Sequence, residues 1–266
     1  MSRILSRHPF WMYLLIFFFS QLIASVPTVL TLVLRRGEAP SSELMIAATL
    51  FAANLLAIHL FLLYRPKDVN WPRTMAGIQG QNGQRTLLVC LLALPLIMLI
   101  HLMQEAFFPD IPDLVGEETF KTIMFHPLGM LTVCFLGPLS EELLFRGGVQ
   151  TDLTLHHSDQ GWAIPILISA VLFTIIHLNP AQMPAAFILG CLLGYAYWWT
   201  GSLIAPVCIH VFNNSLACLL TYLSPDEDNL IQFLGGPTSA GITALVSIFF
   251  FVIILRVIIQ LTKQQP

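Results

Sequence analysis

The stretch Pro138-Leu-Ser-Glu-Glu-Leu-Leu-Phe-Arg-Gly147 places two adjacent glutamates and an arginine inside a chain whose other long segments are almost entirely apolar. Of the 266 residues, 56% are hydrophobic and only 10% are charged, and the mean hydropathy is strongly positive. Soluble domains carry about 25% charged residues, so this composition indicates a polytopic membrane protein. An ionised side chain at bilayer depth costs roughly 2.5 to 3.5 kcal/mol on insertion scales, so such residues first suggest a functional site.

Eight apolar segments are candidates for membrane-spanning helices, because about 20 helical residues cross a hydrocarbon core of about 30 Å. We therefore predict an all-α polytopic membrane protein, a bundle of about eight transmembrane helices with a polar catalytic cavity in the C-terminal half. The first segment is too long for the apolar region of a cleaved signal peptide, so we predict that it is a span. The segments lie near residues 9–34, 44–63, 86–103, 122–136, 163–178, 184–200, 203–223 and 240–261.

The basic residues predict the orientation, and the ionisable residues that cluster between residues 137 and 214 predict where a functional core lies. We expect a single integral-membrane domain over residues 1–266, with N-terminal spans over 1–121, a catalytic core over 122–223 and a C-terminal span over 224–266. Cytoplasmic loops are enriched in Lys and Arg. We expect a protein of a bacterial plasma membrane with both termini in the cytoplasm. In this orientation only three basic residues fall on the opposite side, namely Arg35, Arg36 and Lys121.

The two glutamates differ in the partners that a helix offers them. Glu142 and Arg146 are four residues apart, so they share a helical face and favour an ion pair. Glu141 is turned about 100° away from that face and is predicted to be the free carboxylate. Because Pro138 suits the first turn of a helix and Gly137 permits a break, we predict that a new helical stretch starts at this point in the fourth span.

Two further polar pairs follow on later spans. Phe173 and His177 are four residues apart on the fifth predicted span, and His210 and Asn214 have the same spacing on the seventh. If the fourth and fifth spans form an antiparallel hairpin, the midpoint between residues 141 and 177 falls at residue 159, in a polar turn. Each arm is then about 27 Å long, which places Glu141 and His177 opposite each other inside the bundle.

A carboxylate and two imidazoles can hydrolyse a peptide bond in two ways. In the first, Glu141 and His177 deprotonate a water molecule, while the side chains of the His210 and Asn214 pair donate hydrogen bonds to the developing oxyanion. In the second, His177, His210 and Glu141 bind a zinc ion that activates the water. The HExxH signature of soluble zinc proteases is absent, so we assign no cofactor and leave zinc as the alternative.

Three motifs resemble the CPBP family of intramembrane proteases, which includes CAAX-processing, Ras-converting-enzyme-like and bacteriocin-processing proteins. They are EExxxR at residues 141–146, FxxxH at 173–177 and HxxxN at 210–214, and the resemblance covers roughly residues 127–218. The resemblance implies an intramembrane endopeptidase that cleaves a membrane-associated peptide or lipidated protein in the bilayer, without a nucleic-acid partner. It implies these roles: Glu141 as the base, Glu142 and Arg146 as its supporting pair, His177 as the water-holding partner, Phe173 packed beside it, and His210 with Asn214 as oxyanion stabilisers.

Three other classes of protein fit parts of the pattern. A catalytically silent membrane scaffold of the same fold could use the polar cluster to bind a partner, and this is the main alternative. A rhomboid-type serine protease would use Ser140 with His177, but it leaves the glutamates and the arginine unexplained. An ion-coupled transporter also uses buried ionisable residues, but no inverted repeat is visible.

Overall fold

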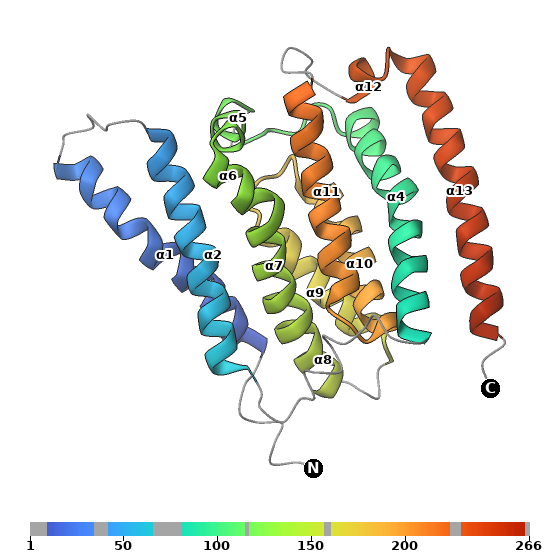
Figure 1. The fold of residues 1–266 in the computed structure, drawn as a ribbon, viewed down its shortest axis with the longest axis horizontal. Helices are drawn as coiled ribbons and strands as arrows, with labels where there is room; N and C mark the ends of the chain where they lie inside the picture. Colours follow the sequence, from blue (N-terminus) through green and yellow to red (C-terminus); the bar gives the residue numbers. More distant parts are fainter. Residues whose placement is uncertain are drawn as a thin grey trace. The chain divides into compact units, whose positions relative to one another are not determined.

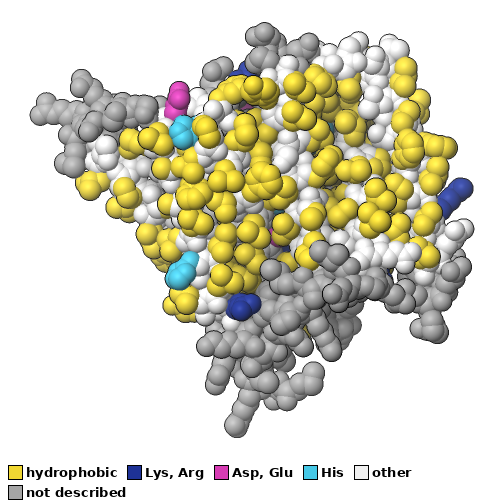
Figure 2. Space-filling view, in the orientation of Figure 1, with side chains coloured by type: hydrophobic (Ala, Val, Ile, Leu, Met, Phe, Trp, Pro, Cys, Tyr) yellow, Lys and Arg dark blue, Asp and Glu magenta, His cyan; other side chains and the backbone are white. Residues whose placement is uncertain are grey.

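The computed structural model describes residues 10–34, 42–65, 81–114, 117–156, 161–223 and 230–263. Every regular element in these ranges is a helix, and none is a strand (Figure 1). Hydrophobic side chains cover most of the face drawn in Figure 2, and charged side chains appear there at only a few places. The predicted class, an all-α polytopic membrane protein, is confirmed. Six helices in the described ranges are long and apolar enough to cross a membrane: Phe10–Thr31, Glu43–Tyr64, Gly83–Phe107, Pro127–His156, Ile204–Leu223 and Pro237–Leu261.

Each of the eight predicted apolar segments contains a helix, but two of them are not among these six candidate spans. α9 (Ala163–Ile175) has only 13 residues. α10 (Met183–Thr200) has 18 residues and is also outside the six. The described chain divides into two compact units, which we describe separately. The predicted single domain and its internal boundaries therefore stay predictions.

Unit 1 comprises residues 1–71, 115–169 and 210–218. Its centre is the continuous helical run Pro127–His156, which we call the motif helix. α1 (Phe10–Leu34) and α2 (Ser42–Tyr64) pack against each other and against this run. α5 (Glu117–Phe125) precedes it, and residues 210–218 belong to α11 (Ile204–Leu223).

The motif helix contains five consecutive elements rather than the predicted break at Gly137. They are α6 (Pro127–Leu131), the π-helix η1 (Thr132–Leu136), α7 (Gly137–Glu142), the π-helix η2 (Leu143–Gln150) and α8 (Thr151–His156). The predicted new α-helical stretch does start here, since α7 begins at Gly137 with Pro138 in its first turn, but it follows η1 without a break. The N–H of Gly137 donates to the carbonyl of Thr132, five residues back, and the helix continues without a gap.

Unit 2 comprises residues 72–114, 170–209 and 219–266. In it, α4 (Gln81–Phe107) packs along α13 (Pro237–Lys263) and also against α10. The carboxylate of Glu105 accepts hydrogen bonds from the backbone N–H groups of Leu230 (2.7 Å) and Ile231 (2.9 Å), which attaches the short α12 (Leu230–Phe233) to α4.

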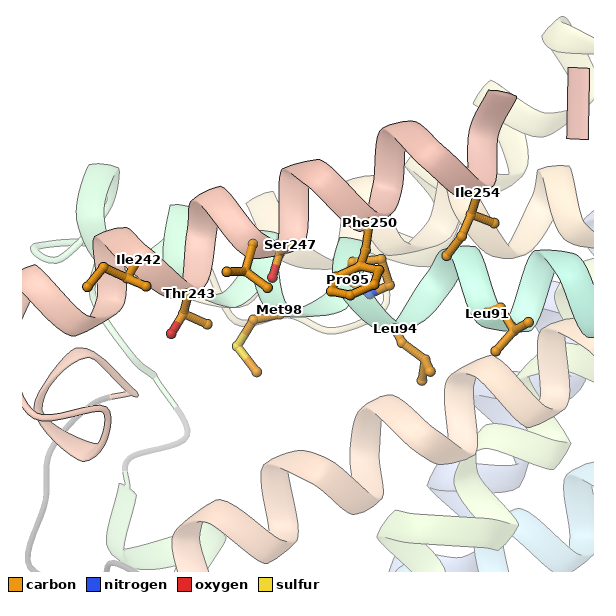
Figure 3. Close-up of a pocket in the computed structure, with 10 residues that line it drawn as sticks. Leu91, Leu94, Pro95, Met98, Ile242, Thr243, Ser247, Phe250 and Ile254 are labelled. Carbon is orange, nitrogen blue, oxygen red and sulfur yellow. The ribbon is translucent and has the colours of Figure 1, made fainter. Parts of the chain in front are cut away.

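A groove of about 520 Å³ lies along α4 and α13 (Figure 3). Its lining is apolar apart from Thr243 and Ser247, and it includes Pro95, which lies within α4. None of the predicted site residues lines this groove. The polar catalytic cavity predicted from the sequence therefore differs from this groove and stays a prediction.

Candidate active site

Glu141 and Glu142 lie at the middle of the motif helix, between its two π-helical segments. A π turn adds one residue to a helical turn, and such turns occur frequently at functional sites because they redirect the side chains around them. Gly137 lies one turn before Glu141. A Cβ atom at residue 137 would be 3.9 Å from the Glu141 carboxylate and 3.2 Å from the carbonyl of Thr132, so glycine fits the close turn on this side.

The predicted ion pair between Glu142 and Arg146 is present. Nη1 of Arg146 lies 3.2 Å from Oε1 of Glu142, and both side chains are fully buried. Nδ1 of His210 lies 2.8 Å from the same oxygen. An ionised carboxylate only accepts hydrogen bonds, so with Glu142 ionised, Nδ1 of His210 is the donor. Glu142 therefore links α7, η2 and α11.

Glu141 lies on the other side of the His210 ring. Its Oε2 is 3.8 Å from Nε2 of His210, which is too long for a direct hydrogen bond. The Glu141 side chain is 22% exposed, whereas that of Glu142 is fully buried. One water molecule can contact two groups at such a separation. The two adjacent carboxylates therefore have different surroundings: Glu142 forms a buried ion pair, and Glu141 faces accessible space.

Asn214 lies one helical turn after His210 on α11 and contacts the same motif helix. Its Nδ2 donates to the carbonyl of Val133 at 2.9 Å. Its Oδ1 accepts from Nδ2 of Asn213 at 3.1 Å. The structure thus joins three of the six predicted polar site residues, Glu142, Arg146 and His210, in one buried network in unit 1. Glu141 and Asn214 lie beside this network.

His177 and Phe173 belong to unit 2 and contact each other as predicted. The two rings pack edge to face, 4.8 Å between centroids, and Nδ1 of His177 lies 2.8 Å from the Phe173 carbonyl. A carbonyl accepts, so Nδ1 carries the proton, and Nε2 of the neutral ring is an acceptor. The predicted pairing of His177 with Glu141 links residues of two separately described units and stays a prediction.

The apolar pattern predicted that His177 lies within the fifth helix, but in the structure His177 lies after the end of that helix. α9 ends at Ile175, because the segment that follows contains Asn179 and Pro180, and a proline disfavours helical backbone in the residue before it. Leu178 adopts a left-handed conformation with φ of 51°, which is unusual for a residue with a branched side chain. Asn179 is fully buried and its Nδ2 donates to Asp113 at 2.8 Å. This contact of the buried Asn179 side chain stabilises the turn that carries His177.

In the part of the chain that the structure describes, no three His, Cys, Asp or Glu side chains are grouped as a metal site requires. The zinc alternative needs His177 together with His210 and Glu141, and these residues lie in the two separately described units. Their grouping therefore stays a prediction.

Sequence analysis missed the contacts that attach α1 and α2 to the motif helix. The hydroxyl of Ser140, next to Glu141, donates to Oδ1 of Asn54 on α2, and both residues are buried. The ring of Tyr13 on α1 packs directly over Gly148. The sequence held a signal for the contact between Ser140 and Asn54. Asn54 is the one asparagine in the apolar second span, and polar side chains in membrane helices form hydrogen bonds across helix interfaces.

Comparisons with known proteins match the motif-bearing part of the chain. Residues 123–216 match the family model described as type II CAAX prenyl endopeptidase Rce1-like. The chain is 26% identical over 146 residues to the membrane-embedded CAAX protease MroQ of Staphylococcus aureus (strain USA300), covering 51% of this chain and 58% of that relative. It is 29% identical over 167 residues to an uncharacterized 24.3 kDa protein of Escherichia coli, covering 60% of this chain and 73% of that protein.

No solved structure matches the chain. The family match and the apolar helices together identify an integral, multi-pass membrane protein, and they confirm the resemblance that the three motifs predicted.

Proposed function

We propose, from the premise that residues 123–216 belong to the Rce1-like family of CAAX endopeptidases, that the chain is an intramembrane endopeptidase with a glutamate-activated water. The observation that carries the proposal is that His210 on α11 lies beside Glu141 and Glu142, which are at the middle of the candidate membrane-spanning helix Pro127–His156. Buried ionisable groups at this depth are costly, and a catalytic site is a function that explains their presence.

Glu141 is the general base in this proposal. Among the described residues, no Lys or Arg forms an ion pair with Glu141 as Arg146 does with Glu142, and the Glu141 side chain is 22% exposed. A water molecule between the Glu141 carboxylate and Nε2 of His210 transfers a proton to Glu141 as its oxygen attacks the peptide carbonyl. Glu141 then returns the proton to the leaving amine, so hydrolysis yields a carboxylate and a new amino terminus.

Glu142 and Arg146 orient His210. The bond from Nδ1 of His210 to Glu142 directs Nε2 toward Glu141. In the neutral ring Nε2 is an acceptor that can bind the attacking water, and in the imidazolium form it is a donor for the oxyanion. Asn214 supplies a second donor from a fixed amide.

The zinc-dependent type is the alternative, since a carboxylate on Nδ1 also orients histidines that bind zinc through Nε2. In that case His177, His210 and Glu141 would bind the ion, which would supply an activated water. His177 otherwise acts as the water-holding partner, with its Nε2 directed away from the Phe173 carbonyl.

The proposed substrate is a membrane-associated peptide or lipidated protein, since the family description names CAAX prenyl endopeptidases and one relative is called a CAAX protease. The proposed location is a bacterial plasma membrane with both termini in the cytoplasm. The two curated relatives are from bacteria, which supports the first point.

Quantitative proteomics of membrane peptides tests the proposal. Cells expressing the wild-type chain are compared with cells expressing Glu141→Gln at equal protein level. We expect new peptide termini that are present only with the wild-type chain. Identical termini in both samples, with both proteins folded, would instead favour the silent scaffold of the same fold.

A further inference from the structure

We propose that Pro138 is a positioning residue that orients Asn214 for catalysis by withholding a backbone hydrogen-bond donor. The inference rests on the proposed function, because it concerns Asn214 as a donor to the substrate.

The starting point is the π turn that leads into Pro138. The N–H of Gly137 donates to the carbonyl of Thr132, five residues back. In the same register the next N–H along the chain, at residue 138, would donate to the carbonyl of Val133. Proline has no N–H, so this bond cannot form. The Val133 carbonyl accepts from Nδ2 of Asn214 on α11 instead, at 2.9 Å.

This contact fixes the orientation of the Asn214 amide. A carbonyl oxygen only accepts, so Nδ2 must face Val133, and Oδ1 faces Asn213, whose Nδ2 donates to it at 3.1 Å. An amide nitrogen has two protons, so Nδ2 keeps a second N–H that can donate to a developing oxyanion. The Sγ atoms of Cys134 and Cys218 are 3.1 Å apart and bring the same two segments together one helical turn further along α11.

A purely structural role for Pro138 makes a different prediction. A proline inside a helix lowers stability, so Pro138→Ala should leave the melting temperature unchanged or raise it. The positioning role adds a loss of turnover, because alanine supplies an N–H that competes with Asn214 for the Val133 carbonyl. A small misplacement of a catalytic group can cost about 100-fold in rate.

The decisive comparison is between Pro138→Ala and a chain in which lactic acid replaces Pro138. Lactic acid has the side chain of alanine and an ester oxygen in place of the N–H, so the two proteins differ in the donor and in a weaker Gly137 carbonyl acceptor. The assay measures kcat and KM in proteoliposomes, with a peptide that carries a cleavage site recovered by the proteomic comparison.

We expect Pro138→Ala to lower kcat by about 100-fold with KM within about twofold, and the lactic acid protein to keep a kcat near that of the wild type. Combined with Asn214→Ala, Pro138→Ala should cause no further loss, because both changes act on the same donor. Pro27→Ala, at the proline inside α1, is the matched control and should keep the wild-type kcat.

Equal kcat for the alanine and lactic acid proteins, at either the wild-type or a reduced level, would overturn the inference, since the N–H would then have no effect. If Pro138→Ala does not fold, a lactic acid protein with less than a tenth of the wild-type kcat still overturns it. Failure of the proposed function is recognised separately, because the wild-type protein would then show no hydrolysis that Glu141→Gln removes.

Discussion

Replacing Glu142 by glutamine removes one negative charge from the buried network and keeps the shape of the side chain. Arg146 then keeps its positive charge with a fully buried side chain, and its ionised partner at 3.2 Å is lost. His210 also loses the carboxylate that its Nδ1 contacts at 2.8 Å. The neighbouring Glu141 offers a matched control, because it is the same residue type, one position away, with a 22% exposed side chain.

The expected loss of stability follows from the burial. Breaking a fully buried ion pair by removing one partner costs about 3 to 5 kcal/mol, because an uncompensated charge remains. For a domain of this size, 1 kcal/mol corresponds to a shift in Tm of about 2 to 4 °C. We therefore expect Glu142→Gln to lower Tm by at least roughly 6 °C, with loss of activity. Glu141→Gln should change Tm by less than about 2 °C.

Thermal unfolding of the purified variants in one detergent measures these shifts. The double variant Glu142→Gln with Arg146→Gln removes both charges and should recover part of the lost stability, since the buried charge that lost its carboxylate is then also absent. A Tm for Glu142→Gln equal to that of the wild type, or equal losses for Glu141→Gln and Glu142→Gln, would refute the distinction between a structural and a free carboxylate.

Three other outcomes are expected. Gly148→Ala places a methyl group 2.5 Å from the buried ring of Tyr13 and should lower the free energy of unfolding by about 1 to 3 kcal/mol. The control Gly241→Ala has open space around the new methyl group and should not destabilise the protein. Equal effects of the two changes would contradict the packing argument. Ser140→Ala leaves the Asn54 acceptor buried and should cost about 1 to 3 kcal/mol, so an unchanged Tm would argue against this contact. Elemental analysis of the purified protein should find substoichiometric zinc and activity that persists after dialysis against a chelator; one zinc per chain, needed for activity, would instead establish a metalloprotease.

Local spacing was sufficient to predict part of the site. The Glu142 to Arg146 ion pair follows from two residues four apart on one helical face. Phe173 and His177 have the same spacing and are in contact, although His177 lies in the turn after α9. The all-α membrane fold follows in the same way from the length and apolarity of the segments. These features depend only on residues that are close together in the sequence, so they can be predicted from local spacing and composition.

Contacts between distant segments could not be derived in this way. His210 and Glu142 are 68 positions apart in the sequence and lie on different helices. The structure brings them together through π turns in the motif helix, whose register has no reliable sequence signal. Gly137 and Pro138 suggested a break in the helix, but the helix widens into a π turn there and continues. The end of α9 before His177 had a usable signal in Pro180, which the apolar pattern obscured.

The turnover of purified Glu141→Gln tests the central claim most directly. Wild-type and variant proteins are reconstituted at equal concentration, their Tm values are compared, and cleavage of the same membrane peptide is followed by mass spectrometry. The account predicts matching Tm values, a product with a new amino terminus from the wild type, and no detectable product from Glu141→Gln. Near-native turnover by a folded Glu141→Gln protein would contradict the assignment of this carboxylate as the base.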